Sequence, residues 1–196
     1  MGRPGSAIAQ AQHGRRYGRR VTIGYVALLR AINLGAKRRV SMPQLREVLT
    51  AQGFGEVRTH LASGNVLLDS PLGEAELAER LTAIIREEFA LDVPVVLRTA
   101  EELAGVVAAD PVGEVATDPS RYSVTFFPTA PDPELVAALP PADGGTYAVR
   151  NRELYLRLPD GVMQSPMGKW KWDQLLGVEG TARNWNTVTK LVELAD

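Results

Sequence analysis

The order of strand and helix patterns over residues 21–109 constrains the fold more than any other feature of the sequence. The apolar run "VTIGYVALL" at 21–29 is typical of a central strand. A helix pattern then begins at Ser41 and ends at Gly53. Strand, turn, strand, helix and strand patterns follow at 56–62, 63–65, 66–70, 73–90 and 93–98. The predicted order is β-α-β-β-α-β, the split β-α-β or ferredoxin-like arrangement, and a capping box of Thr99 with Glu102 starts one more helix, to about Ala109.

The rest of the chain predicts a second, similar unit. Residues 110–120 contain two prolines and no apolar periodicity, so they read as a linker. Residues 121–196 then predict a β-α-β-β-α subdomain with a C-terminal helix that docks on the body. We therefore expect an α+β protein of two similar split β-α-β subdomains packed together, 21–109 and 121–196.

Charge separates the N-terminal segment from this body. Of the 22 basic residues, five are arginines within residues 1–20, where there is no acidic residue. The remaining 17 basic residues face 23 acidic ones, so the body is negative and a poor general binder of nucleic acid. Residues 1–20 are predicted to form a disordered Arg-rich tail. With no stretch long enough to span a membrane, a cytoplasmic location is expected.

Composition and motifs exclude several chemistries. The chain has no cysteine and only two histidines, His13 and His60. Thiolate sites are therefore impossible, and His-rich metal sites and His-centred triads are hard to build. No phosphate-binding, nucleophile-elbow, zinc-protease or dinucleotide-binding motif is present. We expect no metal and no cofactor, and enzymatic activity stays an open question.

Topology predicts one polar site. In a β-α-β-β unit the first two strands are parallel, so the loop at 30–39 and the turn at 63–65 meet at one edge of the sheet. Gly35 and Gly64 leave backbone N–H groups accessible there, and the loop leads into a helix N-terminus, which favours anions. The polar side chains are those of Arg30, Asn33, Lys37, Ser63 and Asn65. Together they suit a phosphate or a carboxylate.

The segment "TARNWNT" at 181–187 offers three more candidates. Asn184 or Asn186 can cap the last helix, which leaves Arg183 free to bind a phosphate or carboxylate bidentately. On this interpretation Arg183, Asn184 and Asn186 join the anion site. The alternative is a docking clasp that only fastens the last helix.

Three separated blocks resemble one known family. "YVALLRAINLGAKRRVSMPQLREVLTAQGF", "VRTHLASGNVLL" and "TARNWNTVTKL" are similar to the signature blocks of the domain-of-unknown-function 1697 family, in the same order. Ala31 and Ala36 stand where that family commonly has glycine. The resemblance implies a small bacterial α+β protein with two similar subdomains, and it implies no activity.

The leading hypothesis is a binding protein for an anionic small molecule, either a nucleotide or a phosphorylated metabolite, in preference to a long nucleic acid. Two alternatives stay open. One is an enzyme acting on a phosphorylated or carboxylated small molecule, and the other is a purely structural or interaction protein in which all three blocks serve packing. The sequence leaves the identity of the ligand and the oligomeric state open.

Overall fold

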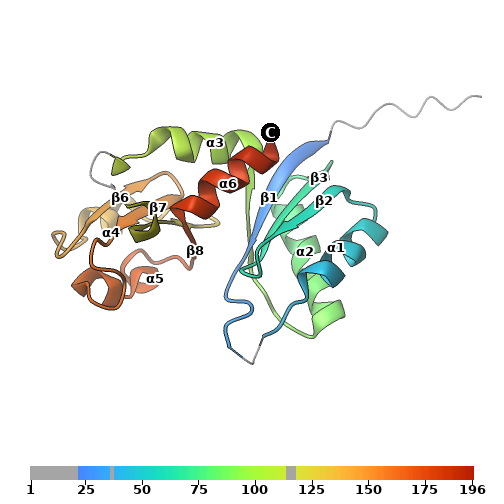
Figure 1. Cartoon of the computed structure of the whole chain (residues 1–196), viewed down its shortest axis with the longest axis horizontal. Helices are drawn as coiled ribbons and strands as arrows, with labels where there is room; N and C mark the ends of the chain where they lie inside the picture. Colours follow the sequence, from blue (N-terminus) through green and yellow to red (C-terminus); the bar gives the residue numbers. More distant parts are fainter. Residues whose placement is uncertain (1–21, 36–37, 114–117) are drawn as a thin grey trace, which may run out of the picture.

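The protein consists of two four-stranded sheets with a pair of helices crossing between them (Figure 1). The computed structural model describes residues 22–35, 38–113 and 118–196. The predicted Arg-rich tail at 1–20, Lys37 and part of the predicted linker at 110–120 therefore lie outside the described residues.

The first sheet contains the strands predicted from the sequence. Its elements are β1 (Ile23–Leu29), α1 (Met42–Ala51), β2 (Gly55–His60), β3 (Asn65–Ser70), α2 (Glu74–Phe89) and β4 (Val95–Thr99). The strand order is β2-β3-β1-β4 and every neighbouring pair is antiparallel. Since β1 and β2 both run antiparallel to β3, they are parallel to each other, as the site prediction requires.

Local side-chain chemistry sets the helix boundaries. The Ser41 hydroxyl accepts a hydrogen bond from the Gln44 N–H at 3.4 Å, which caps α1. Gly53 follows α1 in the left-handed region with φ of 88°. Thr99 and Glu102 form the predicted capping box at the start of α3 (Ala100–Ala109).

The second sheet repeats the first in order. Its elements are β5 (Tyr122–Phe126), α4 (Pro133–Ala137), β6 (Thr146–Arg150), β7 (Glu153–Arg157), α5 (Trp172–Leu175), β8 (Thr181–Asn184) and α6 (Trp185–Ala195). Short 3-10 helices cover Pro119–Arg121 and Pro166–Lys169. The strand order β6-β7-β5-β8 reproduces that of the first sheet strand for strand. The two-subdomain α+β architecture is thus confirmed.

The β-α-β-β-α prediction for 121–196 is wrong in one element. The segment "TARN" forms strand β8, paired with β5, and the helix α6 begins directly after it. A four-residue strand with three polar members carries no alternating apolar signal, so periodicity alone does not reveal it. The strand completes the second sheet, because β8 takes the place that β4 has in the first.

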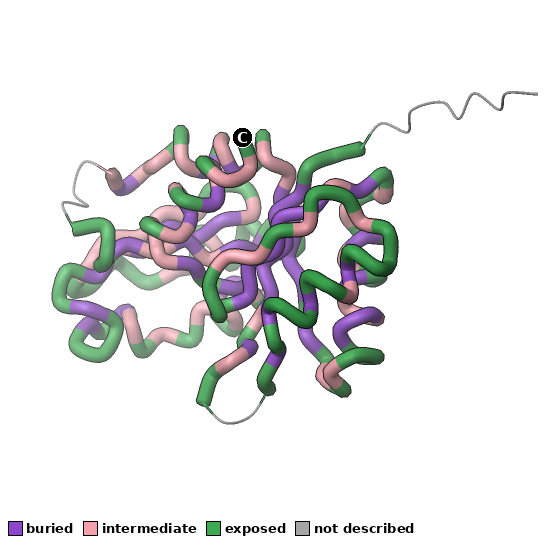
Figure 2. Tube along the Cα trace, turned by 45° about the vertical axis from the view of Figure 1, so that its right-hand side comes forward, coloured by how far each residue is buried: buried purple, intermediate pink, exposed green. Residues whose placement is uncertain are grey.

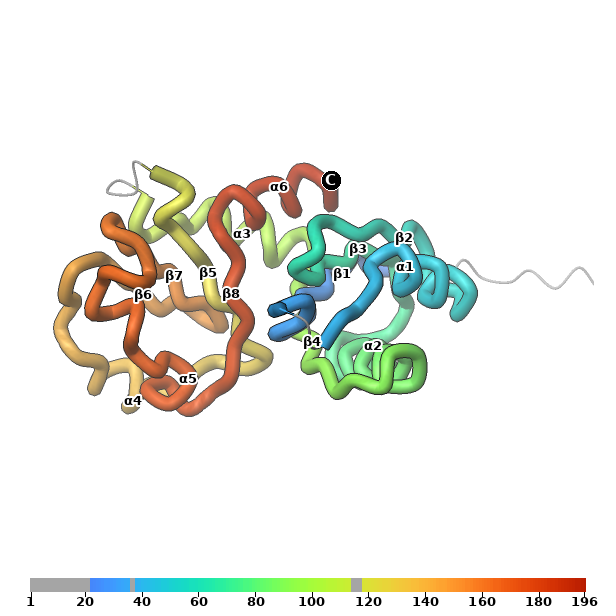
Figure 3. Tube along the Cα trace, turned by 60° about the horizontal axis from the view of Figure 1, so that its bottom comes forward, coloured from blue at the N-terminus to red at the C-terminus, as the bar shows by residue number. Residues whose placement is uncertain are grey.

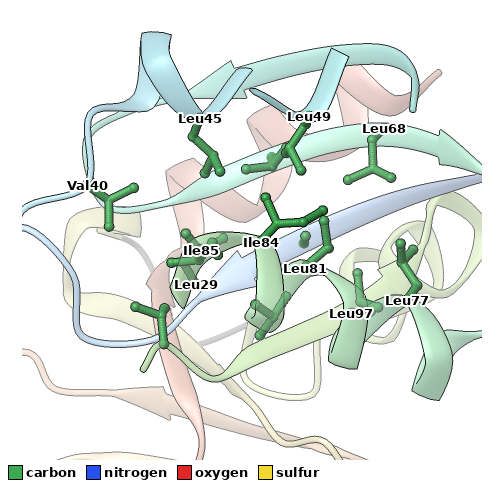
Figure 4. Close-up of a cluster of buried hydrophobic side chains, with 14 of the residues drawn as sticks. Leu29, Val40, Leu45, Leu49, Leu68, Leu77, Leu81, Ile84, Ile85 and Leu97 are labelled. Carbon is green, nitrogen blue, oxygen red and sulfur yellow. The ribbon is translucent and has the colours of Figure 1, made fainter. Parts of the chain in front are cut away.

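Two main cores hold the layers together. The first lies between the outer face of the first sheet and the helices α1 and α2 (Figure 4), where Leu49 of α1 lies beside the strand residue Leu68. The second lies between the inner faces of both sheets, with α3 and α6 packed into it. Figure 2 shows the resulting band of buried chain across the middle of the molecule. Val188 and Leu191 of α6 are fully buried in this second core, so the C-terminal helix docks on the body as predicted.

A buried arginine fastens the first sheet to the second. The Arg98 side chain, on β4, is 1% exposed, and its Nε donates to Glu153 Oε1 at 2.7 Å across the interface. Its Nη2 donates to the backbone carbonyls of Phe127 and Arg152 at 2.9 and 3.0 Å. Burial lowers the pKa of Arg98, and the Glu153 carboxylate acts in the opposite direction. We call this arrangement the Arg98 clamp.

Replacing Arg98 by methionine leaves the buried Glu153 carboxylate without its partner. We expect Arg98→Met to lower the free energy of unfolding by about 3–5 kcal/mol, measured by urea denaturation. The double variant Arg98→Met/Glu153→Met removes both charges, so we expect it to regain at least half of that loss. A single variant as stable as the wild type would show that the clamp contributes nothing to the fold.

Candidate functional site

Arg183 on β8 makes a second clamp in the opposite direction. The Arg183 Nε donates to Asn65 Oδ1 at 2.5 Å, and Nη2 donates to the Leu29 and Gly64 carbonyls at 2.9 and 3.0 Å. Its Nη1 donates to Thr181 Oγ1 and to the Ala182 carbonyl, both at 2.8 Å. All five N–H groups of this guanidinium therefore have acceptors within the protein.

The two clamps share four equivalent hydrogen bonds, and Arg183 adds a fifth, to the Thr181 hydroxyl. Arg98 and Arg183 each precede the N-cap residue of a helix, α3 or α6. Each donates Nε to the first residue of the third strand in the other sheet, Glu153 or Asn65. Each Nη2 also donates to two backbone carbonyls of the other sheet. For Arg98 these are Arg152 and Phe127, and for Arg183 they are the equivalent Gly64 and Leu29. The two halves therefore hold each other by an equivalent pair of contacts.

The clamps differ in charge. Arg98 faces a carboxylate, whereas Arg183, 6% exposed, faces the neutral amide of Asn65. Burial lowers the pKa of Arg183 to about 10, and no acidic group in the described part of the chain counters that effect. A buried cation without a counter-ion is unusual, because burying an unpaired charge is costly.

Arg30 lies just beyond β1 and binds the other subdomain. Its Nε donates to the Gly180 carbonyl at 3.0 Å, Nη1 to Glu179 Oε2 at 2.5 Å and Nη2 to Asp173 Oδ2 at 2.8 Å. These contacts hold α5 and the segment that follows it next to the loop that leaves β1, and Figure 3 shows β8 running beside that loop. Within the described residues, three of the five Arg30 N–H groups have acceptors.

The loop after β1 has an unusual backbone. Ala31, Asn33 and Arg38 all have positive φ, between 52° and 57°, which is uncommon for residues other than glycine. The Asn33 side chain holds the loop closed, since its amide donates to the Val40 and Ala62 carbonyls and its Oδ1 accepts from the Val40 N–H. The left-handed φ of Ala31 is a conformation that glycine adopts at no steric cost. Such strained residues concentrate at functional sites.

A hollow of about 290 Å³ opens between this loop, the turn after β2 and the start of β8. Its wall is mostly aliphatic, and the charged residues in its lining are Arg30 and Arg183. The lining residues are Leu29, Arg30, Ala31, Ile32, Leu34, Ser63, Gly180, Thr181, Ala182 and Arg183.

The hollow contains three of the eight predicted site residues: Arg30, Ser63 and Arg183. Asn33 and Asn65 are not in the lining, and Asn65 donates to the His60 carbonyl and to Ser63 Oγ. Asn184 and Asn186 are not in the lining.

The Asn184 side chain caps α6 by accepting from the Asn186 N–H, and it donates to three carbonyls at 119, 120 and 122. Of the two predicted cap residues, Asn184 and Asn186, the structure selects Asn184, whereas the prediction that Arg183 is free is wrong. Lys37 lies outside the described residues.

The site also contains groups that the sequence interpretation missed. Asp173 and Glu179 bind Arg30, and the Thr181 hydroxyl accepts from Arg183. Thr181 is the first residue of the "TARNWNT" segment, so its place in that segment could have marked it as a site residue. Asp173 and Glu179 carry no signal in one sequence, because their approach to Arg30 depends on how the two subdomains pack.

Fold and site together define a two-subdomain α+β protein with an aliphatic, cation-bearing hollow at the subdomain interface. The chain belongs to the family described as "Protein of unknown function (DUF1697)", whose model matches residues 23–155. The fold is similar to that of the conserved bacterial protein SP0830 from Streptococcus pneumoniae, at a TM-score of 0.73 and 21% identity over 90% of this chain and 100% of that one. No curated protein matches the chain in sequence.

Two further properties concern only the part of the chain that the structure describes. No helix there has the length and apolar character needed to cross a membrane. No group of three or more His, Asp or Glu side chains there is arranged to hold a metal ion.

Substitution of Gly64 tests how tightly the chain is packed beside the Arg183 clamp and the loop after β1. A β-carbon on Gly64 would lie 2.7 Å from Ile32 Cδ1 and 2.8 Å from Leu29 Cβ, whereas one on Gly53 would meet no atom within 4 Å. Both glycines have φ near 85–88°. We expect Gly53→Ala to destabilise the protein by about 1–2 kcal/mol through its backbone alone, and Gly64→Ala to lose about 1–3 kcal/mol more through the clash. Thermal and urea unfolding measure both, and equal losses would contradict the close packing.

Proposed function

We propose that the hollow beside Arg30 and Arg183 binds a small anionic molecule. The observation that carries this proposal is the buried Arg183 guanidinium, which lines the hollow and has no counter-ion in the described residues. An anion in the hollow would place a negative charge near Arg183, which has no acidic partner of its own, and the attraction would be strong because the Arg183 side chain is buried.

In this proposal some residues only shape the hollow, and others, at its rim, bind the anion directly. Arg183, Asn33 and Asn65 use their polar atoms within the protein, so they shape the hollow and set its electrostatic potential. Arg30 retains two N–H groups beyond those bound in the described structure. Together with the Ser63 hydroxyl it is the proposed direct ligand, and Asn184 and Asn186 are assigned to the start of α6.

The residues that line the hollow limit which classes of anion can bind there. None of the described residues around the hollow is aromatic, so a nucleobase would find no stacking surface. At about 290 Å³ the space is at the small end of ligand sites. We therefore favour a phosphorylated or carboxylated metabolite over a nucleotide, and either over a long nucleic acid. A cytoplasmic location stays a prediction.

One observation favours the structural alternative. Every Arg183 N–H already has an acceptor in the protein, as a docking clasp would require. In that case the three family blocks would serve packing alone and no anion would bind. The geometry offers no support for a catalytic group, so an enzyme is the weaker alternative.

Binding is testable by thermal shift with inorganic phosphate, glycerol 2-phosphate, acetate and butyrate as probes. A probe at a hundredfold its dissociation constant should add about 2.7 kcal/mol of stability. We expect Arg30→Gln to lose that shift because it removes the rim cation. Ala182→Leu should lose it by filling the hollow without changing charge. Arg86→Gln, at an exposed arginine that pairs with Asp92 on α2, is the matched control and should keep it.

The same titrations separate the alternatives. The proposal fails if no probe shifts the melting temperature of the wild type, or if Arg30→Gln and Ala182→Leu both keep the full shift while remaining folded. Either result would indicate that the three sequence blocks serve packing and do not bind an anion.

A further inference from the structure

The Glu179 carboxylate occupies the position at Arg30 that a bound carboxylate would take. Glu179 Oε2 accepts from Arg30 Nη1 at 2.5 Å, and the Glu179 side chain is 69% exposed. Asp173 is bound more firmly, because its Oδ2 accepts from Arg30 and its Oδ1 accepts from the Gly180 N–H at 3.2 Å. Of the two carboxylates, Glu179 is therefore the one that can leave at small cost, since an exposed ion pair contributes little stability.

The charges around the hollow favour a ligand with a single negative charge. Arg30 and Arg183 are cationic, and Asp173 and Glu179 are anionic, so these four groups balance. When Glu179 turns into solvent, one positive charge remains uncompensated. A monoanion restores the balance, whereas a dianion such as a phosphate monoester would exceed it in a site that already contains Asp173.

The walls indicate what the anion is attached to. Leu29, Ala31, Ile32 and Leu34 line one side of the hollow, and Leu34 is 71% exposed. An exposed leucine beside a hollow gains from contact with an apolar ligand group, at roughly 25 cal/mol for each Å² that is buried. A short aliphatic body therefore matches these walls.

We propose that the ligand is a small aliphatic monocarboxylate, which binds Arg30 in the place of Glu179 and lays its hydrocarbon part against Ile32 and Leu34. This inference rests on the proposed anion site and adds the chemical class of the ligand. Glu179 then acts as an internal competitor that any carboxylate must displace.

The test compares Glu179→Gln with the wild type by calorimetric titration of butyrate, succinate and glycerol 2-phosphate. The amide keeps the size of the side chain and removes its charge, so we expect butyrate to bind the variant about two- to fivefold more tightly, the range that an exposed ion pair provides. Glu193→Gln, at an exposed glutamate that pairs with Lys190 on α6, is the matched control and should leave butyrate affinity unchanged.

Three outcomes would overturn the inference. Equal butyrate affinity in Glu179→Gln and the wild type would show that Glu179 does not compete. Tighter binding of glycerol 2-phosphate than of butyrate, lost in Arg30→Gln, would contradict the monocarboxylate while leaving the anion site intact. Binding of no probe by the wild type or by Glu179→Gln would remove both the inference and the proposed function.

Discussion

The exchange of arginines between the two sheets is the contact on which the rest of the structure depends. Each sheet ends in a strand whose arginine enters the other sheet and donates to backbone carbonyls at one end of its two central strands. Those carbonyls also receive structural hydrogen bonds, from the Leu29 N–H to Gly64 and from the Phe127 N–H to Arg152. The contacts therefore join backbone to backbone through a planar group that few other side chains can replace. Packing of α3 against α6 in the shared core follows from this alignment.

The proposed function arises from the difference between the clamps. In one half the first residue of the third strand is a glutamate and the arginine is neutralised. In the other half it is an asparagine, which satisfies the hydrogen bond but not the charge. The hollow opens beside the clamp that keeps its charge, next to the loop where Ala31 and Asn33 hold left-handed conformations.

The sequence predicts most of the fold and the approach of the loop at 30–39 to the turn at 63–65, but not how the side chains there are bonded. Apolar periodicity and the caps at Ser41 and Thr99 predict the first sheet, and the topology of that sheet brings the loop at 30–39 to the turn at 63–65. The sequence does not reveal that the acceptors of Arg183 lie within the protein. An arginine that binds a ligand and an arginine that binds the protein's own carbonyls are the same residue in a sequence. Nor does the sequence place Asp173 and Glu179, more than 140 residues from Arg30, because that contact depends on the packing of the two subdomains.

Native-state amide hydrogen exchange tests the central claim, that the reciprocal clamps make both sheets one cooperative unit. The slowest amides of β1 and β5, which lie in the buried centres of the two sheets, should share one free energy of opening in the wild type. Arg183→Lys keeps the charge but supplies three donors for the five acceptors that Arg183 binds, so some acceptors lose their hydrogen bonds. The variant should therefore lower the free energy of opening equally in both strands. Loss of protection confined to the first sheet, with the second unchanged, would show that the halves unfold independently and would contradict the account.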